Sequence, residues 1–252
     1  MSIALVISAS AHASPWGAPD TFLIISRADY FRADLDATDT APSGDFQRLE
    51  SNTYFEWGLA DRFTIGGKVV YGSSWLTRGG VTETVSGVSE YGGFLQYQIF
   101  QRNSDVGAVR IMGTAPSEFQ SGVRPELASD GVDLEVAGLY GRTIRAADPK
   151  IFIGFETGYL RRFSDSADQI RNQTTFGVEP SENWLFLLDI FSAVSLGNAD
   201  PGGADFDVVK AQPSIVYRPQ KRWGLQLGLT EEVAGRNLEL GRTVFLGLWT
   251  RF

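Results

Sequence analysis

From Thr21 to the C-terminus, apolar and polar residues alternate with a period of two, and turn residues interrupt the alternation every 10 to 20 positions or so. Successive side chains of a strand point to opposite faces of a sheet, so this period predicts strands with one apolar and one polar face. Between Phe63 and Trp75, for example, the odd positions are mostly apolar and the even positions hold mainly Thr, Gly, Lys and Ser. Glycine, at 28 residues, supplies many turns. The sequence therefore predicts an all-β fold.

The turn residues divide the chain into twelve expected strands, and the connections between them alternate in length. Short connections are expected at 60–61, 101–104, 144–149, 180–183 and 219–221, long ones at 35–45, 77–86 and 115–131, and middling ones at 163–168, 198–204 and 234–238. An even strand number with short turns on one side and longer loops on the other is typical of an outer-membrane barrel. We predict a single closed antiparallel up-and-down transmembrane β-barrel over residues 14–252, with both termini on the short-turn side, in the periplasm. The expected strands are 21–34, 46–59, 62–76, 87–100, 105–114, 132–143, 150–162, 169–179, 184–197, 205–218, 222–233 and 239–252.

A soluble β-sandwich is the alternative fold, because its strands also alternate between an apolar and a polar face. The aromatic residues favour the barrel, since they form two belts like those at the two interfaces of a bilayer. One belt lies beside the short turns and comprises Trp57, Phe63, Tyr97, Tyr140, Trp184, Tyr217 and Trp223. The other lies nearer the opposite strand ends and comprises Tyr30, Tyr71, Trp75, Tyr91 and Tyr159.

Residues 1–13 form a short apolar stretch that ends in small residues. Its last three residues, Ala11-His12-Ala13, fit the pattern that precedes cleavage by signal peptidase, and the mature chain would begin at Ser14. No Lys or Arg precedes the stretch, so we interpret it as the remnant of a signal peptide. A buried N-terminal strand or helix is the alternative.

The residue content then excludes several kinds of chemistry. The sequence has no Cys, and its one His, His12, lies in the expected signal segment. The mature chain would lack Ser-His-Asp and Cys-His catalysis, thiolate zinc sites, disulfides and haem ligation by His. The net charge of −8 argues against a nucleic-acid partner. We expect no enzyme, no cofactor and no metal site; Glu135 and Glu156 are the best candidates for a hydrolytic carboxylate pair, but neighbouring carboxylates are expected in any acidic wall.

If the apolar positions face lipid, the opposite parity lines the lumen, where charges are tolerated. The expected pore-lining residues are Arg27, Asp29, Lys68, Gln96, Arg110, Glu135, Glu156, Asp189, Lys210 and Gln226. Their order along the chain places the basic residues on one arc and Glu135, Glu156 and Asp189 on the opposite arc. Such walls would set up a transverse field across a narrow pore; alternatively, the charges pair and plug it. The expected lumen aromatics, which would narrow the pore, are Phe94, Phe152, Phe191, Phe245 and Trp249.

Three segments resemble known families of outer-membrane barrels. The run from Val244 to Phe252, with Leu246 and Leu248 on the face of Phe252, resembles the C-terminal signal that the barrel-assembly machinery reads, although Thr250 departs from it. The hairpin from Tyr54 to Gly66 resembles the "E-x-G-L-x-D-R-x-T-L-G" hairpin of transporter-like barrels of the meta-pathway (phenol degradation) loci. The start Ser14-Pro15-Trp16-Gly17 is similar to that of XagA-like barrels encoded beside exopolysaccharide genes. These resemblances imply an outer-membrane barrel and say little about its substrate.

The sequence thus predicts a channel of a Gram-negative outer membrane for a small polar solute or for exopolysaccharide export. Outer-membrane lipid and the barrel-assembly machinery are the expected partners. A sealed barrel that acts as a scaffold or surface receptor through residues 35–45 and 115–131 is the main alternative. An uptake channel for hydrophobic, aromatic compounds is a third interpretation, which rests on the meta-pathway resemblance.

Overall fold

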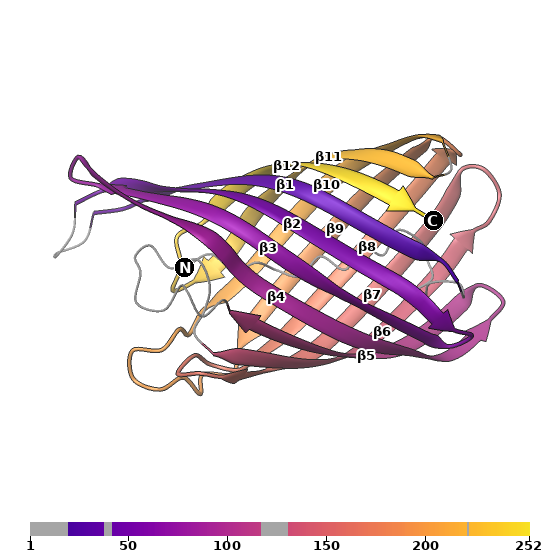
Figure 1. Cartoon of the computed structure of the whole chain (residues 1–252), viewed down its shortest axis with the longest axis horizontal. Helices are drawn as coiled ribbons and strands as arrows, with labels where there is room; N and C mark the ends of the chain where they lie inside the picture. The colour runs from indigo at the N-terminus through magenta and orange to yellow at the C-terminus, as the bar shows by residue number, and fades with distance from the viewer. Residues whose placement is uncertain (1–19, 38–41, 117–130, 221) are drawn as a thin grey trace.

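The computed structural model describes residues 20–37, 42–116, 131–220 and 222–252, and these form a closed β-barrel of twelve antiparallel strands (Figure 1). The predicted all-β barrel is confirmed, and most strand ends lie within a few residues of their predicted positions. The expected signal segment, 1–13, lies outside the described residues. The strands are β1 (Phe22–Leu35), β2 (Gly44–Ala60), β3 (Phe63–Arg78), β4 (Val81–Arg102), β5 (Asp105–Pro116), β6 (Val132–Arg145), β7 (Lys150–Phe163), β8 (Gln169–Ser181), β9 (Trp184–Ser195), β10 (Asp207–Gln220), β11 (Trp223–Arg236) and β12 (Gly241–Arg251).

The barrel closes between its first and last strands. β1 and β12 pair in antiparallel register, with Tyr30 opposite Val244. At the end of this seam Phe22 and Phe252 exchange backbone hydrogen bonds of 3.1 and 2.9 Å. Both strand ends lie beside the short turns, as the alternation of connections predicts. Closure leaves no sheet edge unpaired, which a structure surrounded by lipid requires.

The connection between β3 and β4 is much shorter than predicted. Instead of a long loop over 77–86, the two strands continue to a two-residue turn at Gly79 and Gly80, and β4 reaches 22 residues. Both glycines have positive φ, 56° and 80°, as a tight hairpin turn requires. The hairpin projects, beside the adjoining ends of β1 and β2, beyond the other strands of the barrel (Figure 1). The other two predicted long loops fall partly on residues 38–41 and 117–130, which lie outside the described residues.

The outer surface of the barrel is apolar. Exposed aliphatic and aromatic side chains cover it, including Tyr71 at 51% and Leu246 at 55% exposure. Aromatic pairs lie near the short turns, where the Phe63 and Tyr97 rings are 4.9 Å apart and the Trp184 and Tyr217 rings 4.7 Å apart. No helix among the described residues is long and apolar enough to cross a membrane. An apolar outer band with aromatic residues near its edges suits a bilayer.

Glycines receive three of the aromatic rings that face the lumen. Phe94, Phe152 and Phe245 lie opposite Gly66, Gly177 and Gly228 on neighbouring strands. A Cβ atom added to Gly177 would lie 2.1 Å from the Phe152 ring, so the ring occupies the space that the missing side chain leaves. These three rings lie against the barrel wall, so they narrow the lumen less than rings that extend towards the barrel axis would. Phe191 and Trp249 also face inward and are buried.

Candidate functional site

The predicted pore-lining residues all have the inward parity of their strands. Most of their side chains are buried, with Lys68 only 3% and Arg110 only 4% exposed. They form a charged layer inside the barrel. We define this layer as the ten predicted pore-lining residues together with four inward partners, Glu90, Arg171, Gln212 and Glu232. The alternation of apolar and polar residues does not predict which of these side chains form ion pairs and hydrogen bonds with one another.

Lys68 on β3 forms an ion pair with Glu90 on β4. A β-bulge lies beside this pair: Glu90 is opposite Val70, whereas Val88 is opposite Tyr71, so Ser89 has no counterpart in the ladder. A bulge places two neighbouring side chains on the same face. Ser89 is accordingly buried, and its hydroxyl donates to the Val70 carbonyl at 3.3 Å.

Arg110 on β5 holds two carboxylates of the predicted acidic arc. Its guanidinium pairs with Glu156 on β7 and lies 3.6 Å from Glu135 on β6. Arg171 on β8 approaches the other Glu135 oxygen at 3.5 Å. Two cations and two carboxylates from four strands therefore form a chain of contacts in which the charge alternates, in the order Glu156, Arg110, Glu135 and Arg171. Each charge is compensated by a close neighbour. Such compensation makes burial of the charges tolerable.

A second group of polar side chains connects β1 with β8–β11. Arg27 pairs with Asp29 at 2.5 Å and donates to the Gln212 amide oxygen at 3.2 Å. Gln212 in turn donates to Asp189 at 3.4 Å and accepts from the Thr230 hydroxyl at 2.8 Å. The Arg27 guanidinium also lies 4.1 Å from the centre of the Phe245 ring, a cation–π contact.

Asp189 accepts two further hydrogen bonds, from the Thr175 hydroxyl at 2.5 Å and the Gln173 amide at 3.3 Å. Towards the loop end, Lys210 pairs with Glu232 on β11 at 2.6 Å. This pair also lies next to a bulge, since the ladder shifts register between Val209 and Lys210. Gln226 donates to Ser214 at 2.9 Å and accepts from the Trp249 indole at 2.9 Å.

The predicted separation into a basic and an acidic wall is wrong. Arg110 contacts two of the three expected acidic residues directly, and Arg171 contributes a cation within the acidic arc. Lys68 and Lys210 are each neutralised by a glutamate of an adjacent strand. The prediction failed because it omitted the inward residues Glu90, Arg171, Gln212 and Glu232. Glu90, Gln212 and Glu232 have the same parity as a predicted residue on the same strand, and Arg171 has the inward parity of β8, so the alternation contained the signal.

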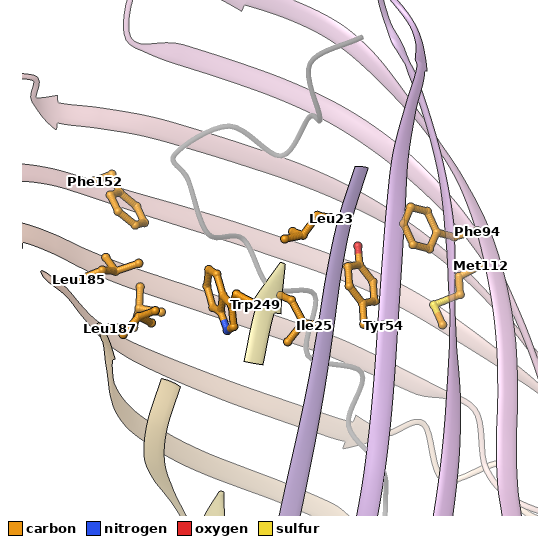
Figure 2. Packing of buried hydrophobic residues seen from close by; sticks show 10 residues of the cluster. Leu23, Ile25, Tyr54, Phe94, Met112, Phe152, Leu185, Leu187 and Trp249 are labelled. Atoms are coloured by element: carbon orange, nitrogen blue, oxygen red, sulfur yellow. The ribbon is translucent and has the colours of Figure 1, made fainter. Parts of the chain in front are cut away.

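An apolar collar lines the lumen near the short-turn end. It comprises Leu23, Ile25, Tyr54, Phe94, Met112, Phe152, Leu185, Leu187, Val216 and Trp249, which form one cluster of buried residues (Figure 2). The Tyr54 and Phe94 rings stack with centres 5.8 Å apart, and the Tyr54 hydroxyl donates to Glu56 at 2.9 Å. A solute that moves along the barrel axis would meet two different surfaces in series: the collar and the charged layer.

At the loop end, the β7–β8 and β9–β10 connections are joined through Asp168. Its carboxylate accepts from the Arg162 backbone at 2.9 Å, the Tyr159 hydroxyl at 2.7 Å, Arg161 at 2.7 Å and Asn198 at 3.0 Å. These donors hold the pKa of Asp168 well below its usual range, because they outweigh the effect of desolvation, the largest single contribution. The two connections therefore form one hydrogen-bonded unit at the mouth of the barrel.

No known family model matches the sequence, and no curated protein matches it. Solved structures do match. A COG4313 outer membrane channel from Pseudomonas putida F1 superposes with a TM-score of 0.70 at 10% identity, covering 95% of this chain and 98% of that one. The NanC porin gives 0.60 at 7% identity over 90% and 98% of the two chains. The translocator domain of the autotransporter NalP from Neisseria meningitidis gives 0.56 at 9% identity over 96% and 92%.

The chain has the fold of a bacterial outer-membrane β-barrel. Identities this low show the fold alone, so the meta-pathway and exopolysaccharide-locus resemblances stay predictions. The same holds for the assembly signal at Leu246, Leu248 and Phe252, although Phe252 does lie at the closing seam of the barrel. Among the described residues there is no group of His, Cys, Asp and Glu side chains arranged to hold a metal ion.

Proposed function

We propose that this barrel is an outer-membrane channel for small polar solutes, with both termini in the periplasm. The charged layer is the observation that carries the proposal. A barrel that served only as a scaffold would be stable with an apolar interior, and a buried ion pair contributes little net stability over an apolar pair of the same volume. A layer of ion pairs and amides, in contrast, offers polar partners to a solute within the lumen.

The pairing of the charges also affects the ion selectivity expected of the channel. Because Arg110, Lys68 and Lys210 each have a carboxylate close by, the layer presents neighbouring donors and acceptors rather than a field of one sign. We therefore expect weak selectivity between anions and cations. Neutral or zwitterionic solutes suit such a lining. Export of an exopolysaccharide chain is the variant of this proposal that the XagA-like resemblance favours.

The apolar collar supports the second candidate, a channel for hydrophobic compounds, because its ten residues offer apolar contacts along part of the lumen. The charged layer counts against this candidate, since an apolar solute gains nothing from ion pairs. We propose no enzymatic activity. Glu135 and Glu156 both form ion pairs with Arg110, which occupies the two carboxylates that a hydrolytic pair would use.

Single-channel recording tests the proposal. The refolded chain, inserted in a planar bilayer, is expected to give stable conductance steps with weak ion selectivity. Glu135→Lys should shift the selectivity towards anions, because it leaves Arg110 and Arg171 without a shared carboxylate. Glu83→Lys, the same change on the exposed part of the β3–β4 hairpin, is the control and should leave selectivity nearly unchanged. Insertion without conductance would refute the channel and favour a scaffold or receptor that acts through its loops.

A further inference from the structure

A cavity of about 290 Å³ lies at the short-turn end of the barrel. The end of β4 and the β4–β5 turn form one side, with Gln101 and Asn103. The ends of β6, β7 and β8 form the other side, with Thr143, Lys150 and Glu179. Phe152, which belongs to the apolar collar (Figure 2), also lines the cavity. The cavity, which we call the vestibule, therefore adjoins the collar at the mouth of the lumen.

Several polar groups of the vestibule have hydrogen-bond donors or acceptors that no other protein group uses. Among the described residues, the side chains of Asn103 and Thr143 form no hydrogen bond, and neither is buried. The side-chain amide oxygen of Gln101 accepts from the Gln98 side-chain amide at 3.2 Å, which leaves the Gln101 NH2 group to donate elsewhere. The Lys150 ammonium is 3.9 Å from Glu179, too far for a hydrogen bond. The vestibule thus offers amide, hydroxyl and ammonium groups within one small volume.

The charges of the vestibule are already compensated within the protein. Glu179 has Lys150 on one side and Arg218 at 3.3 Å on the other. Asp105 accepts from the Tyr140 hydroxyl and from Ser104. A strongly charged ligand would therefore meet no excess of opposite charge here. The apolar lining of Val106, Ile151 and Phe152 faces the same volume, so a favourable ligand combines several neutral polar groups with an apolar face.

We propose that the vestibule binds one ring of a neutral sugar. A pyranose ring has hydroxyl groups around its edge, for the amides and the Thr143 hydroxyl, and C–H groups on its faces, for the Phe152 side of the cavity. The volume is at the lower end of the range for small-molecule sites, which suits one ring better than a longer segment. The inference rests on the proposed channel and deepens it: the solute is a sugar, held at the short-turn mouth before or after it passes the collar.

Saturation-transfer NMR tests binding without requiring conduction. The full chain in detergent micelles is titrated with D-glucose, and with glycine and benzoate as zwitterionic and apolar comparisons. We expect saturation transfer to glucose and little to the other two. Asn103→Gly combined with Thr143→Val should weaken glucose binding about tenfold, since it removes two hydrogen-bonding side chains. Both changes suit the backbone, because Asn103 has a positive φ of 49° and valine matches threonine in shape.

Gln47→Ala, at a half-buried position of β2 near the opposite, loop end of the barrel, is the control and should leave glucose binding unchanged. Glucose that does not bind, or that binds the double variant as well as the unchanged chain, would overturn the inference. The two proposals fail differently. A conducting barrel that does not bind glucose keeps the channel and loses the sugar site, whereas a barrel that binds glucose through Asn103 and Thr143 without conducting keeps the site and loses the channel.

Discussion

The guanidinium of Arg27 on β1 donates a hydrogen bond to the Gln212 amide on β10 at 3.2 Å, although β11 and β12 separate the two strands in the wall. A contact of this kind crosses the inside of the barrel instead of following the sheet. Arg110 does the same on the other side, where it passes β6 to reach Glu156 on β7. The interior is thus held by long side chains that join strands the backbone ladder does not join.

Gln212 is the centre of one such connection, so Gln212→Ala should destabilise the barrel. The change leaves the Thr230 hydroxyl without its partner and removes one hydrogen bond each from Arg27 and Asp189, and an unsatisfied buried polar group costs about 1–3 kcal/mol. Unfolding in urea from lipid vesicles would measure the loss. Gln47→Ala removes two hydrogen bonds near the loop end of the barrel, one from Tyr30 and one to Asp45, and should cost less, about 0.5 kcal/mol. Equal effects for the two variants would contradict the assigned role of Gln212.

The sequence was sufficient to predict the barrel because a strand between lipid and lumen must alternate. Each residue predicted to line the lumen has inward parity in the structure, from Arg27 on β1 to Gln226 on β11. Tight turns carry a weaker signal. Gly79 and Gly80 end a hairpin, but the polar residues on both sides of them match a loop equally well, so the sequence predicted a loop there.

The pairing of charges was harder to predict, for two physical reasons. An arginine side chain is long enough to pass one or more neighbouring strands, so sequence order around the ring does not identify its partner. A bulge also changes the parity along a strand. Up to Ser89 the inward positions of β4 are odd, as at Val85, whereas after it they are even, as at Gln96. Alternation read without the bulge assigns the wrong face to half of that strand.

Arg110 should be the most costly single loss in the charged layer. Arg110→Met leaves Glu135 and Glu156 buried with one cation fewer, and removal of one partner from a buried ion pair costs about 3–5 kcal/mol. Adding Glu156→Gln should restore part of the stability, because it removes a negative charge that has lost the Arg110 cation. A double-mutant cycle from urea unfolding measures this coupling. Strictly additive losses would show that the two residues do not interact.

Gly177 should not tolerate a side chain while Phe152 is present. A Cβ atom at this position would lie 2.1 Å from the ring, so Gly177→Ala should destabilise the barrel by about 1–3 kcal/mol through overpacking. Phe152→Ala in the same chain should relieve the clash, and the double variant should lose less stability than the two single losses sum to. Gly138→Ala is the matched control, because an added Cβ there meets nothing within 4 Å. A similar loss at both glycines would argue against the close packing of Phe152.

Acid should loosen the loop unit that Asp168 holds together. The pKa of Asp168 lies below its usual value, so the ionised carboxylate is favoured in the folded state. Its contribution is therefore complete above the unfolded value of about 3.9 and is lost as the pH falls through the lower folded value. Hydrogen exchange at the Leu196 amide, which donates to the Asp168 carbonyl at 2.9 Å, reports on this unit. Exchange, corrected for its intrinsic pH dependence, should accelerate below about pH 4 in the unchanged chain. In Asp168→Asn, exchange at the Leu196 amide should be fast at every pH, because the amide cannot replace the charged acceptor. Slow exchange that did not depend on pH in either chain would show that Asp168 does not hold the loop unit together.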